Sequence, residues 1–169
     1  MNKKYGNMYE WLTHTHNDIT GECPYQCLYC YMLKQRWKHD TTLRLNDNAL
    51  KTNLGKDNTI FIGSSLDFCH PEIPTEWILK TLDHCNKYIK DNLYLLQTKN
   101  PERFLEQEIL SHPLMQNKEQ IILCTTIETN RDTSKISKAP TPSKRAEAMM
   151  QLSQMGFRTM VTTEPILDF

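Results

Sequence analysis

Short apolar segments alternate with polar and helix-forming segments along the whole chain. Five segments rich in β-branched, aromatic and other apolar residues are predicted as strands: residues 9–17, 59–64, 93–98, 120–126 and 158–163. Between them, apolar spacing and helix-start residues predict helices at 31–38, 75–91, 101–111 and 143–155. Thr75 and Ser143 are predicted as N-caps, and Gly156 as the residue that ends the last helix. The polar stretch 39–57 is predicted to be irregular, with a short extended piece at 42–45.

This order of strands and helices determines the predicted fold class. Strands that alternate with helices form parallel sheets through right-handed crossovers, so the class is α/β with about five parallel strands. An open doubly wound sheet and a partial (β/α) barrel both fit. The 169 residues suffice for a single domain, 1–169, with a real core.

Composition excludes several functional classes. Twenty basic and twenty acidic residues cancel, so no overall field directs the chain to nucleic acid or to an anionic membrane, although a local basic groove remains compatible. No apolar run approaches the roughly 18–20 residues that span a bilayer, and residues 1–7 lack a signal-peptide stretch. We therefore expect a cytoplasmic protein without membrane contact.

Three of the six cysteines lie within eight residues, and this cluster carries the clearest chemical signal. Cys23, Cys27 and Cys30 have the spacing C-x3-C-x2-C in a loop, 21–31, between the first strand and the first helix. Three thiolates on one loop can hold three corners of an iron–sulfur cluster, and the lack of a fourth nearby cysteine leaves one iron open. A closed zinc site with His14, His16 or His39, or chance spacing, are the alternatives.

Polar side chains gather where the predicted strands end, which is where ligands bind in βα folds. In the fourth strand, Ile121 and Leu123 share one face, whereas Cys124, Thr126 and Glu128 share the other. Gln97 and Lys99 end the third strand in the same way, and Glu164 ends the fifth. Each residue by itself is compatible with a hydrogen-bonded polar position at the end of a barrel strand. Their common position favours a ligand-binding site. Cys85 and Cys124 are interpreted as packing residues.

The cysteine spacing, with the aromatic Tyr29 before the third cysteine, resembles the radical S-adenosylmethionine superfamily. The segments GSSLDF, QTKNPERF, TTIETNR and TTEPILDF are similar to a branch found in phages and prophages, distantly like the spore photoproduct lyases, over about residues 11–169. The resemblance implies a partial (β/α) barrel and a 4Fe-4S cluster on the three cysteines. It also implies reductive cleavage of S-adenosylmethionine to a 5′-deoxyadenosyl radical that abstracts hydrogen from a substrate.

The resemblance also implies roles for the residues at the strand ends. Ser64, Ser65 or Asp67 would receive the methionine amino group, although Gly63-Ser64-Ser65 departs from the common Gly-Gly-Glu form. Lys99 or Arg131 would pair with the methionine carboxylate. The ribose contacts expected are Thr126, Glu128 and Asn130. Tyr29 and Glu164 are further cofactor contacts, and Cys69 is a candidate hydrogen-atom donor.

The resemblance further implies partners. We expect an external electron donor of the flavodoxin or ferredoxin type, and nucleic acid is the favoured substrate class by analogy. Family members usually continue past residue 169, so the barrel is expected to be truncated after its fifth strand, with a dimer or a partner chain covering the open edge. A phage-encoded protein would act in the host cytoplasm. The alternative function is a non-catalytic iron–sulfur or zinc-binding module that acts with a partner.

Overall fold

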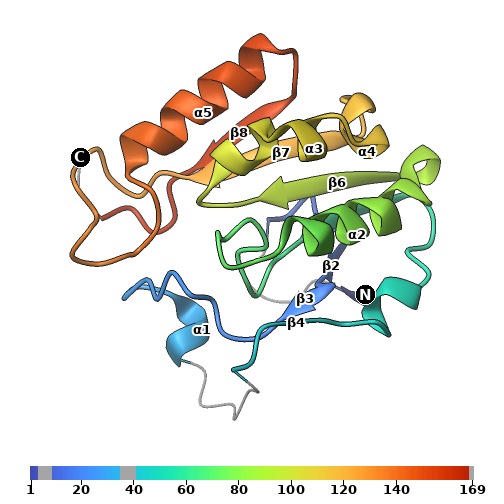
Figure 1. The fold of residues 1–169 in the computed structure, drawn as a ribbon, viewed down its shortest axis with the longest axis horizontal. Helices are drawn as coiled ribbons and strands as arrows, with labels where there is room; N and C mark the ends of the chain where they lie inside the picture. Colours follow the sequence, from blue (N-terminus) through green and yellow to red (C-terminus); the bar gives the residue numbers. More distant parts are fainter. Residues whose placement is uncertain (4–8, 35–40, 168–169) are drawn as a thin grey trace.

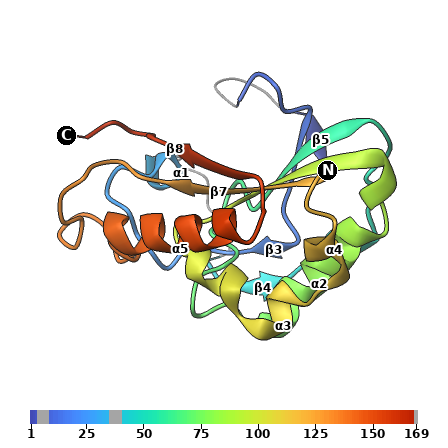
Figure 2. The same ribbon diagram turned by 90° about the horizontal axis from the view of Figure 1, so that it is seen from above.

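In the computed structural model, which describes residues 1–3, 9–34 and 41–167, a mostly parallel sheet is covered on one face by helices (Figures 1 and 2). The parallel strands are β2 (His14–His16), β5 (Asn58–Ile62), β6 (Asn92–Gln97), β7 (Ile121–Thr126) and β8 (Thr159–Thr162). The sheet order is β1-β2-β5-β6-β7-β8, and β1 (Asn2–Lys3) pairs antiparallel with β2. The predicted α/β class and its five parallel strands are confirmed.

Helices connect the strands and lie on the same face of the sheet. They are α2 (Thr75–Asn86), α3 (Gln107–Leu110), α4 (Pro113–Gln116) and α5 (Pro142–Gln154), with 3-10 turns η2 (Ile89–Asp91) and η3 (Pro101–Leu105) (Figure 2). A second sheet pairs β3 (Ile19–Thr20) with β4 (Arg44–Leu45), followed by the turn η1 (Ala49–Lys51), and α1 (Tyr31–Lys34) follows the cysteine loop. The extended piece predicted at 42–45 is thus confirmed as β4.

Strand alternation separates two apolar clusters, one on each face of the sheet. Ile60, Tyr94 and Leu123 belong to the main core, which packs against the helices. Phe61, Leu95 and Cys124 point to the opposite face, where Leu12 covers them. Residues 9–13 were predicted as part of the first strand, and this prediction is wrong. The backbone instead turns, and the Leu12 N–H donates to the Tyr9 carbonyl at 3.0 Å. This turn lets the side chains of Tyr9 and Leu12 both pack on the inner face of the sheet, opposite the helices.

The helix starts differ from their predicted positions. Thr75 is the first helical residue rather than the cap, since its hydroxyl accepts a hydrogen bond from Arg103 at 2.8 Å instead of capping the helix. The last helix begins at Pro142 and is capped by Thr141, whose hydroxyl accepts from the Lys144 N–H, so the predicted cap at Ser143 is also wrong. The helix predicted over 101–111 is broken into η3 and α3. Of the helix predicted over 31–38, residues 31–34 are helical, and residues 35–38 lie outside the described residues.

Candidate functional site

The cysteine loop follows β2 at the end of the sheet where the parallel strands finish. Cys27 is buried, whereas Cys23 and Cys30 are half-buried. The loop is shaped by backbone hydrogen bonds from Gln26 to Cys23 (3.3 Å) and from Cys30 to Cys27 (2.9 Å), and Gln26 adopts a left-handed φ of 47°. Local turns therefore gather all three thiols on one short segment.

A second loop holds this segment in place. The Leu28 N–H donates to the Ile136 carbonyl at 2.9 Å, and the Lys138 N–H donates to the Tyr25 carbonyl at 3.0 Å. The Cys27 sulfur lies 3.1 Å from the Ser137 hydroxyl. Residues 132–142 are rich in Ser, Lys and Pro, and no pattern in this segment indicates its contact with the cysteine loop.

The loop after β5 lies beside the cysteines. The Asp67 backbone hydrogen-bonds to the Cys23 thiol, and the Tyr31 hydroxyl donates to the Ser64 carbonyl at 2.8 Å. Gly63 starts this loop with φ +80°, and a Cβ there would lie 2.7 Å from the Phe68 ring, so glycine is required. The predicted placement of residues 63–67 next to the cysteine loop fits these contacts.

Hydrogen bonds fix the polar groups of that loop. Asn17 accepts from the Ser65 N–H at 3.2 Å and donates to the Ser64 hydroxyl at 3.2 Å. Asp67 accepts from the Thr98 hydroxyl and from the Lys99 N–H, both at 2.6 Å. Both Asp67 oxygens are thus used inside the protein, which makes Ser64 and Ser65 the better candidates for contact with a ligand.

Tyr29 connects the cysteine loop to the residues that follow β7. The Tyr29 hydroxyl donates to Glu128, and Lys99 Nζ lies 5.5 Å from the centroid of the Tyr29 ring. Glu128 also pairs with Arg145 at 2.7 Å, and both side chains are fully buried. Burial by itself would raise the pKa of Glu128, but the hydrogen bonds from Arg145 and Tyr29 outweigh it and hold that pKa below its usual value.

The other predicted site residues are more scattered. Thr126 is buried and bonds to Gln97 (3.1 Å) and Thr162 (3.1 Å) in a polar layer on the inner face, which the Tyr9 hydroxyl joins by donating to Gln97. The structure leaves three predicted residues exposed beyond the strand ends: Asn130, Arg131 and Glu164.

Cys69 differs from the half-buried thiols in its exposure. Its side chain is fully buried in the main core, and its N–H donates to Asp67 at 3.1 Å. Burial raises the pKa of the Cys69 thiol well above its usual value. Burial also raises the pKa of Cys23, to about 11, so Cys23 ionises readily only when a cation binds it.

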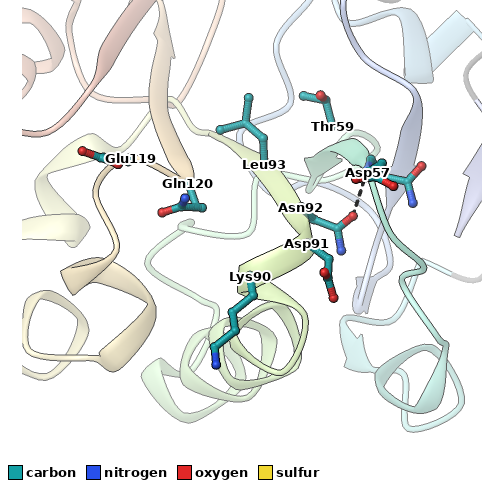
Figure 3. Close-up of a pocket in the computed structure, with 9 residues that line it drawn as sticks. Asp57, Thr59, Lys90, Asp91, Asn92, Leu93, Glu119 and Gln120 are labelled. Carbon is teal, nitrogen blue, oxygen red and sulfur yellow. Dashed lines mark hydrogen bonds between the residues drawn. The ribbon is translucent and has the colours of Figure 1, made fainter.

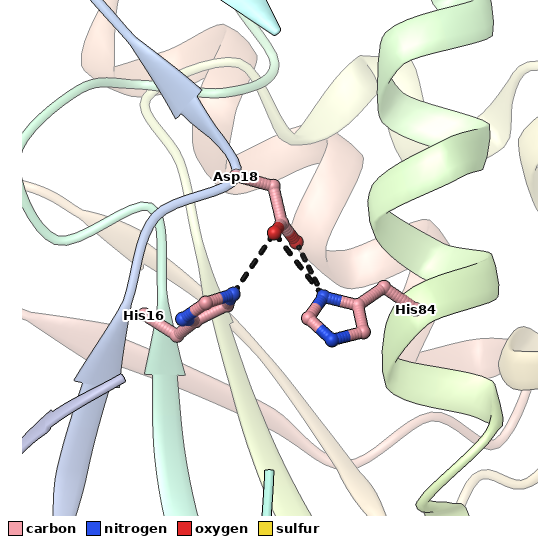
Figure 4. A group of neighbouring side chains, drawn as sticks. All are labelled: His16, Asp18 and His84. Atoms are coloured by element: carbon pink, nitrogen blue, oxygen red, sulfur yellow. Dashed lines mark hydrogen bonds and ion pairs between the residues drawn. The ribbon is translucent and has the colours of Figure 1, made fainter. Parts of the chain in front are cut away.

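A separate group of three side chains lies between the sheet and α2 (Figure 4). Asp18 accepts hydrogen bonds from His16 Nε2 at 2.9 Å and from His84 Nδ1 at 3.1 Å, and the other His84 nitrogen donates to the Thr52 carbonyl at 2.8 Å. All three are buried, and no pattern in the sequence indicates their contact. Both nitrogens of the His84 ring thus face an oxygen atom, Asp18 on one side and the Thr52 carbonyl on the other.

These distances bear on the zinc alternative. Within the described ranges, His16, Asp18 and His84 form the one group of three or more His, Cys, Asp or Glu whose ligand atoms all lie within 4.8 Å of one another. A tetrahedral zinc ion draws its ligand atoms that close together. The three cysteine sulfurs do not form such a group, and His16 is bound to Asp18. His39 lies outside the described residues.

A hollow at the opposite end of the sheet has no comparable chemistry. It is lined by residues at the amino ends of β5, β6 and β7, including Asp57, Thr59, Asn92 and Gln120 (Figure 3). In βα folds this end serves stability rather than ligand binding. In the part of the chain that the structure describes, no helix is long and apolar enough to cross a membrane.

Comparison with solved structures identifies the fold. A point mutant of spore photoproduct lyase superposes with a TM-score of 0.72 over 96% of this chain, at 14% sequence identity. The chain has the fold of the spore photoproduct lyases. A double mutant of such a lyase with bound AdoMet and dinucleoside spore photoproduct gives a TM-score of 0.69 over 94% of the chain, at 12% identity. A lyase complexed with dinucleoside spore photoproduct gives 0.65 over 87%, also at 12% identity.

The partial (β/α) barrel implied by the sequence resemblance is thus confirmed as the fold. The chain spans about half the length of these lyases, covering 48%, 47% and 44% of them. No protein-family model and no curated protein matches the sequence.

Proposed function

We propose that the chain is a radical S-adenosylmethionine enzyme whose 4Fe-4S cluster is held by Cys23, Cys27 and Cys30. The observation that carries the proposal is the position of these thiols on one loop that backbone hydrogen bonds hold in place. This loop lies at the ligand-binding end of a barrel with the lyase fold. When bound, the cluster supplies an electron that splits S-adenosylmethionine to methionine and a 5′-deoxyadenosyl radical. A flavodoxin- or ferredoxin-type protein is the proposed electron donor.

The residues around the loop would bind and orient S-adenosylmethionine. Ser64 and Ser65, held by Asn17, are proposed to receive its amino group. Lys99 or Arg131 would pair with its carboxylate through a charge-assisted contact. Thr126, Asn130 and Glu164 are proposed to face its ribose and adenine.

Nucleic acid is the proposed substrate class. Two of the similar structures hold a dinucleoside spore photoproduct, which is a nucleic acid fragment. The substrate would lie beside the cysteine loop, over the inner face of the sheet. A hydrogen-atom donor is also needed in such a reaction, and Cys69 would have to become exposed on substrate binding to serve in that role, because its thiol is buried.

Metal analysis tests the proposal. Protein reconstituted without oxygen is expected to hold about four irons and four sulfides. Because one iron lacks a protein ligand, adding S-adenosylmethionine should change the electron paramagnetic resonance spectrum of the reduced cluster. Stoichiometric zinc without iron uptake would contradict the proposal and favour a non-catalytic metal module. An iron–sulfur spectrum that S-adenosylmethionine leaves unchanged would contradict the catalytic part.

A further inference from the structure

Glu128 has no oxygen free for a ligand in this structure. One carboxylate oxygen accepts from the Tyr29 hydroxyl and the other from Arg145 Nη1 at 2.7 Å. The side chain is 0% exposed. A ribose-binding carboxylate has to meet the ligand at an open surface, whereas this one is enclosed by protein groups on both sides.

Arg145 anchors the carboxylate from behind. It is also 0% exposed, and its guanidinium donates to the Pro140 carbonyl at 2.8 Å and to the Thr126 carbonyl. These contacts join α5, the end of β7 and the segment before α5. A buried cation with a fixed partner does not reorient at low energetic cost, so Glu128 is held rigidly.

The other partner, Tyr29, is part of the cysteine loop. It directly precedes Cys30, and its ring is half-buried with Lys99 Nζ 5.5 Å from the ring centroid. Lys99, just after β6, and Glu128, just after β7, therefore both contact the Tyr29 side chain. In metal sites, groups that hold the ligand residues in place commonly change affinity or activity by 10- to 100-fold when removed.

We propose that Glu128 is a positioning residue: backed by Arg145, it holds Tyr29 and thereby fixes Cys30 against the barrel. The inference rests on the proposed function, because it assumes that Cys30 holds a cluster iron. It replaces the ribose contact expected for Glu128. We call the group formed by Tyr29, Glu128 and Arg145 the loop brace.

The chain provides a matched pair of variants. Tyr29→Phe removes the hydroxyl that binds Glu128, whereas Tyr25→Phe removes a hydroxyl from the same loop that has no hydrogen-bond partner among the described residues. Both proteins are reconstituted without oxygen, and iron loss to a chelator is followed by absorbance. Tyr29→Phe should lose iron about tenfold faster than wild type, and Tyr25→Phe at the wild-type rate.

Two further measurements separate positioning from general stability. The midpoint potential and resonance spectrum of the cluster should change in Tyr29→Phe, and the melting temperature of the iron-free protein should stay close to that of wild type. Glu128→Gln should accelerate iron loss as Tyr29→Phe does. If Glu128→Gln does not fold, Tyr29→Phe still decides the matter, because it removes one oxygen atom from a half-buried ring.

Three outcomes would overturn the inference. Equal iron loss and equal spectra in Tyr29→Phe, Tyr25→Phe and wild type would show that the loop brace does not position Cys30. Wild-type iron retention in Glu128→Gln, with weakened S-adenosylmethionine binding, would assign the carboxylate to the ligand while leaving the proposed function intact. A wild-type protein that takes up no iron would refute the proposed function, and this inference with it.

Discussion

Replacing Asp18 by alanine is expected to destabilise the protein strongly, whether or not a cluster is bound. Asp18 is fully buried and receives hydrogen bonds from His16 (2.9 Å) and His84 (3.1 Å). The substitution leaves two buried imidazoles without their hydrogen-bond acceptor. Because the group links the end of β2 to α2, its loss loosens the contact between sheet and helix (Figure 4).

The magnitude follows from the contacts. A hydrogen bond to a charged group contributes about 1.5–3 kcal/mol, and two are lost. Together the two lost hydrogen bonds amount to about 3–6 kcal/mol. For a domain of this size, each kcal/mol shifts the melting temperature by about 2–4 °C, so a decrease of roughly 10 °C or more is expected.

Thermal and urea unfolding of the iron-free protein measure the effect. The control is Glu76→Ala, which removes an exposed carboxylate 2.6 Å from Lys80 and should leave the melting temperature unchanged. An Asp18→Ala protein that melts within 2 °C of wild type, a shift of about 1 kcal/mol or less, would refute the interpretation of this group as a stabilising buried hydrogen-bond network.

The same group predicts a pH dependence. Burial would raise the pKa of Asp18, but hydrogen bonds from His16 and His84 outweigh it and lower the pKa below its usual value. A carboxyl with a lowered folded-state pKa stabilises above its unfolded-state pKa, about 3.9, and this contribution disappears as the pH falls through the folded-state pKa. The difference between wild type and Asp18→Ala should therefore narrow below about pH 4. A difference that stays constant down to pH 2 would contradict this assignment.

Four more predictions follow from the site. Cys30→Ala should lose the iron–sulfur absorbance, whereas Cys85→Ala, in the main core, should retain it; equal loss would contradict the ligand assignment. In the iron-free protein, a thiol reagent should label half-buried Cys30 and spare buried Cys69, as mass spectrometry would show; rapid labelling of Cys69 would mean that its thiol opens to solvent. Asn17→Ala should weaken S-adenosylmethionine binding about tenfold by calorimetry, because Ser64 and Ser65 lose their anchor; unchanged affinity would place the amino group elsewhere. Since β8 ends the sheet order and exposes Val161, light scattering should detect self-association that Val161→Lys reduces; a monomeric wild type would exclude it.

Local patterns in the sequence were sufficient to predict the sheet. Alternation placed Ile121 and Leu123 on the helix side and Cys124 on the inner side, and the structure confirms both faces. The three-cysteine spacing likewise located the candidate site, because all three candidate ligands lie in one short segment. Signals of this kind depend on neighbours in sequence, so a single chain is enough to detect them.

Contacts between distant segments left no comparable signal. Arg145 lies in a predicted helix as one more basic residue, and nothing nearby indicates its pairing with Glu128, 17 residues earlier. His84 lies within an amphipathic helix, and its partner Asp18 is 66 residues away. Glu128 was predicted to face inward with the other strand-end residues, but its protein partners decide whether it can reach a ligand. Only the folded arrangement supplies that information.

The formation of 5′-deoxyadenosine tests the central proposal most directly. Reconstituted protein, S-adenosylmethionine and dithionite are combined without oxygen, and the products are measured by mass spectrometry with and without single-stranded or duplex DNA. The proposal predicts equal amounts of 5′-deoxyadenosine and methionine, more of both with a nucleic acid substrate, and none when Cys23, Cys27 and Cys30 are all replaced by alanine. Absence of 5′-deoxyadenosine from protein that holds four irons, or its formation by the cysteine-free variant, would contradict it.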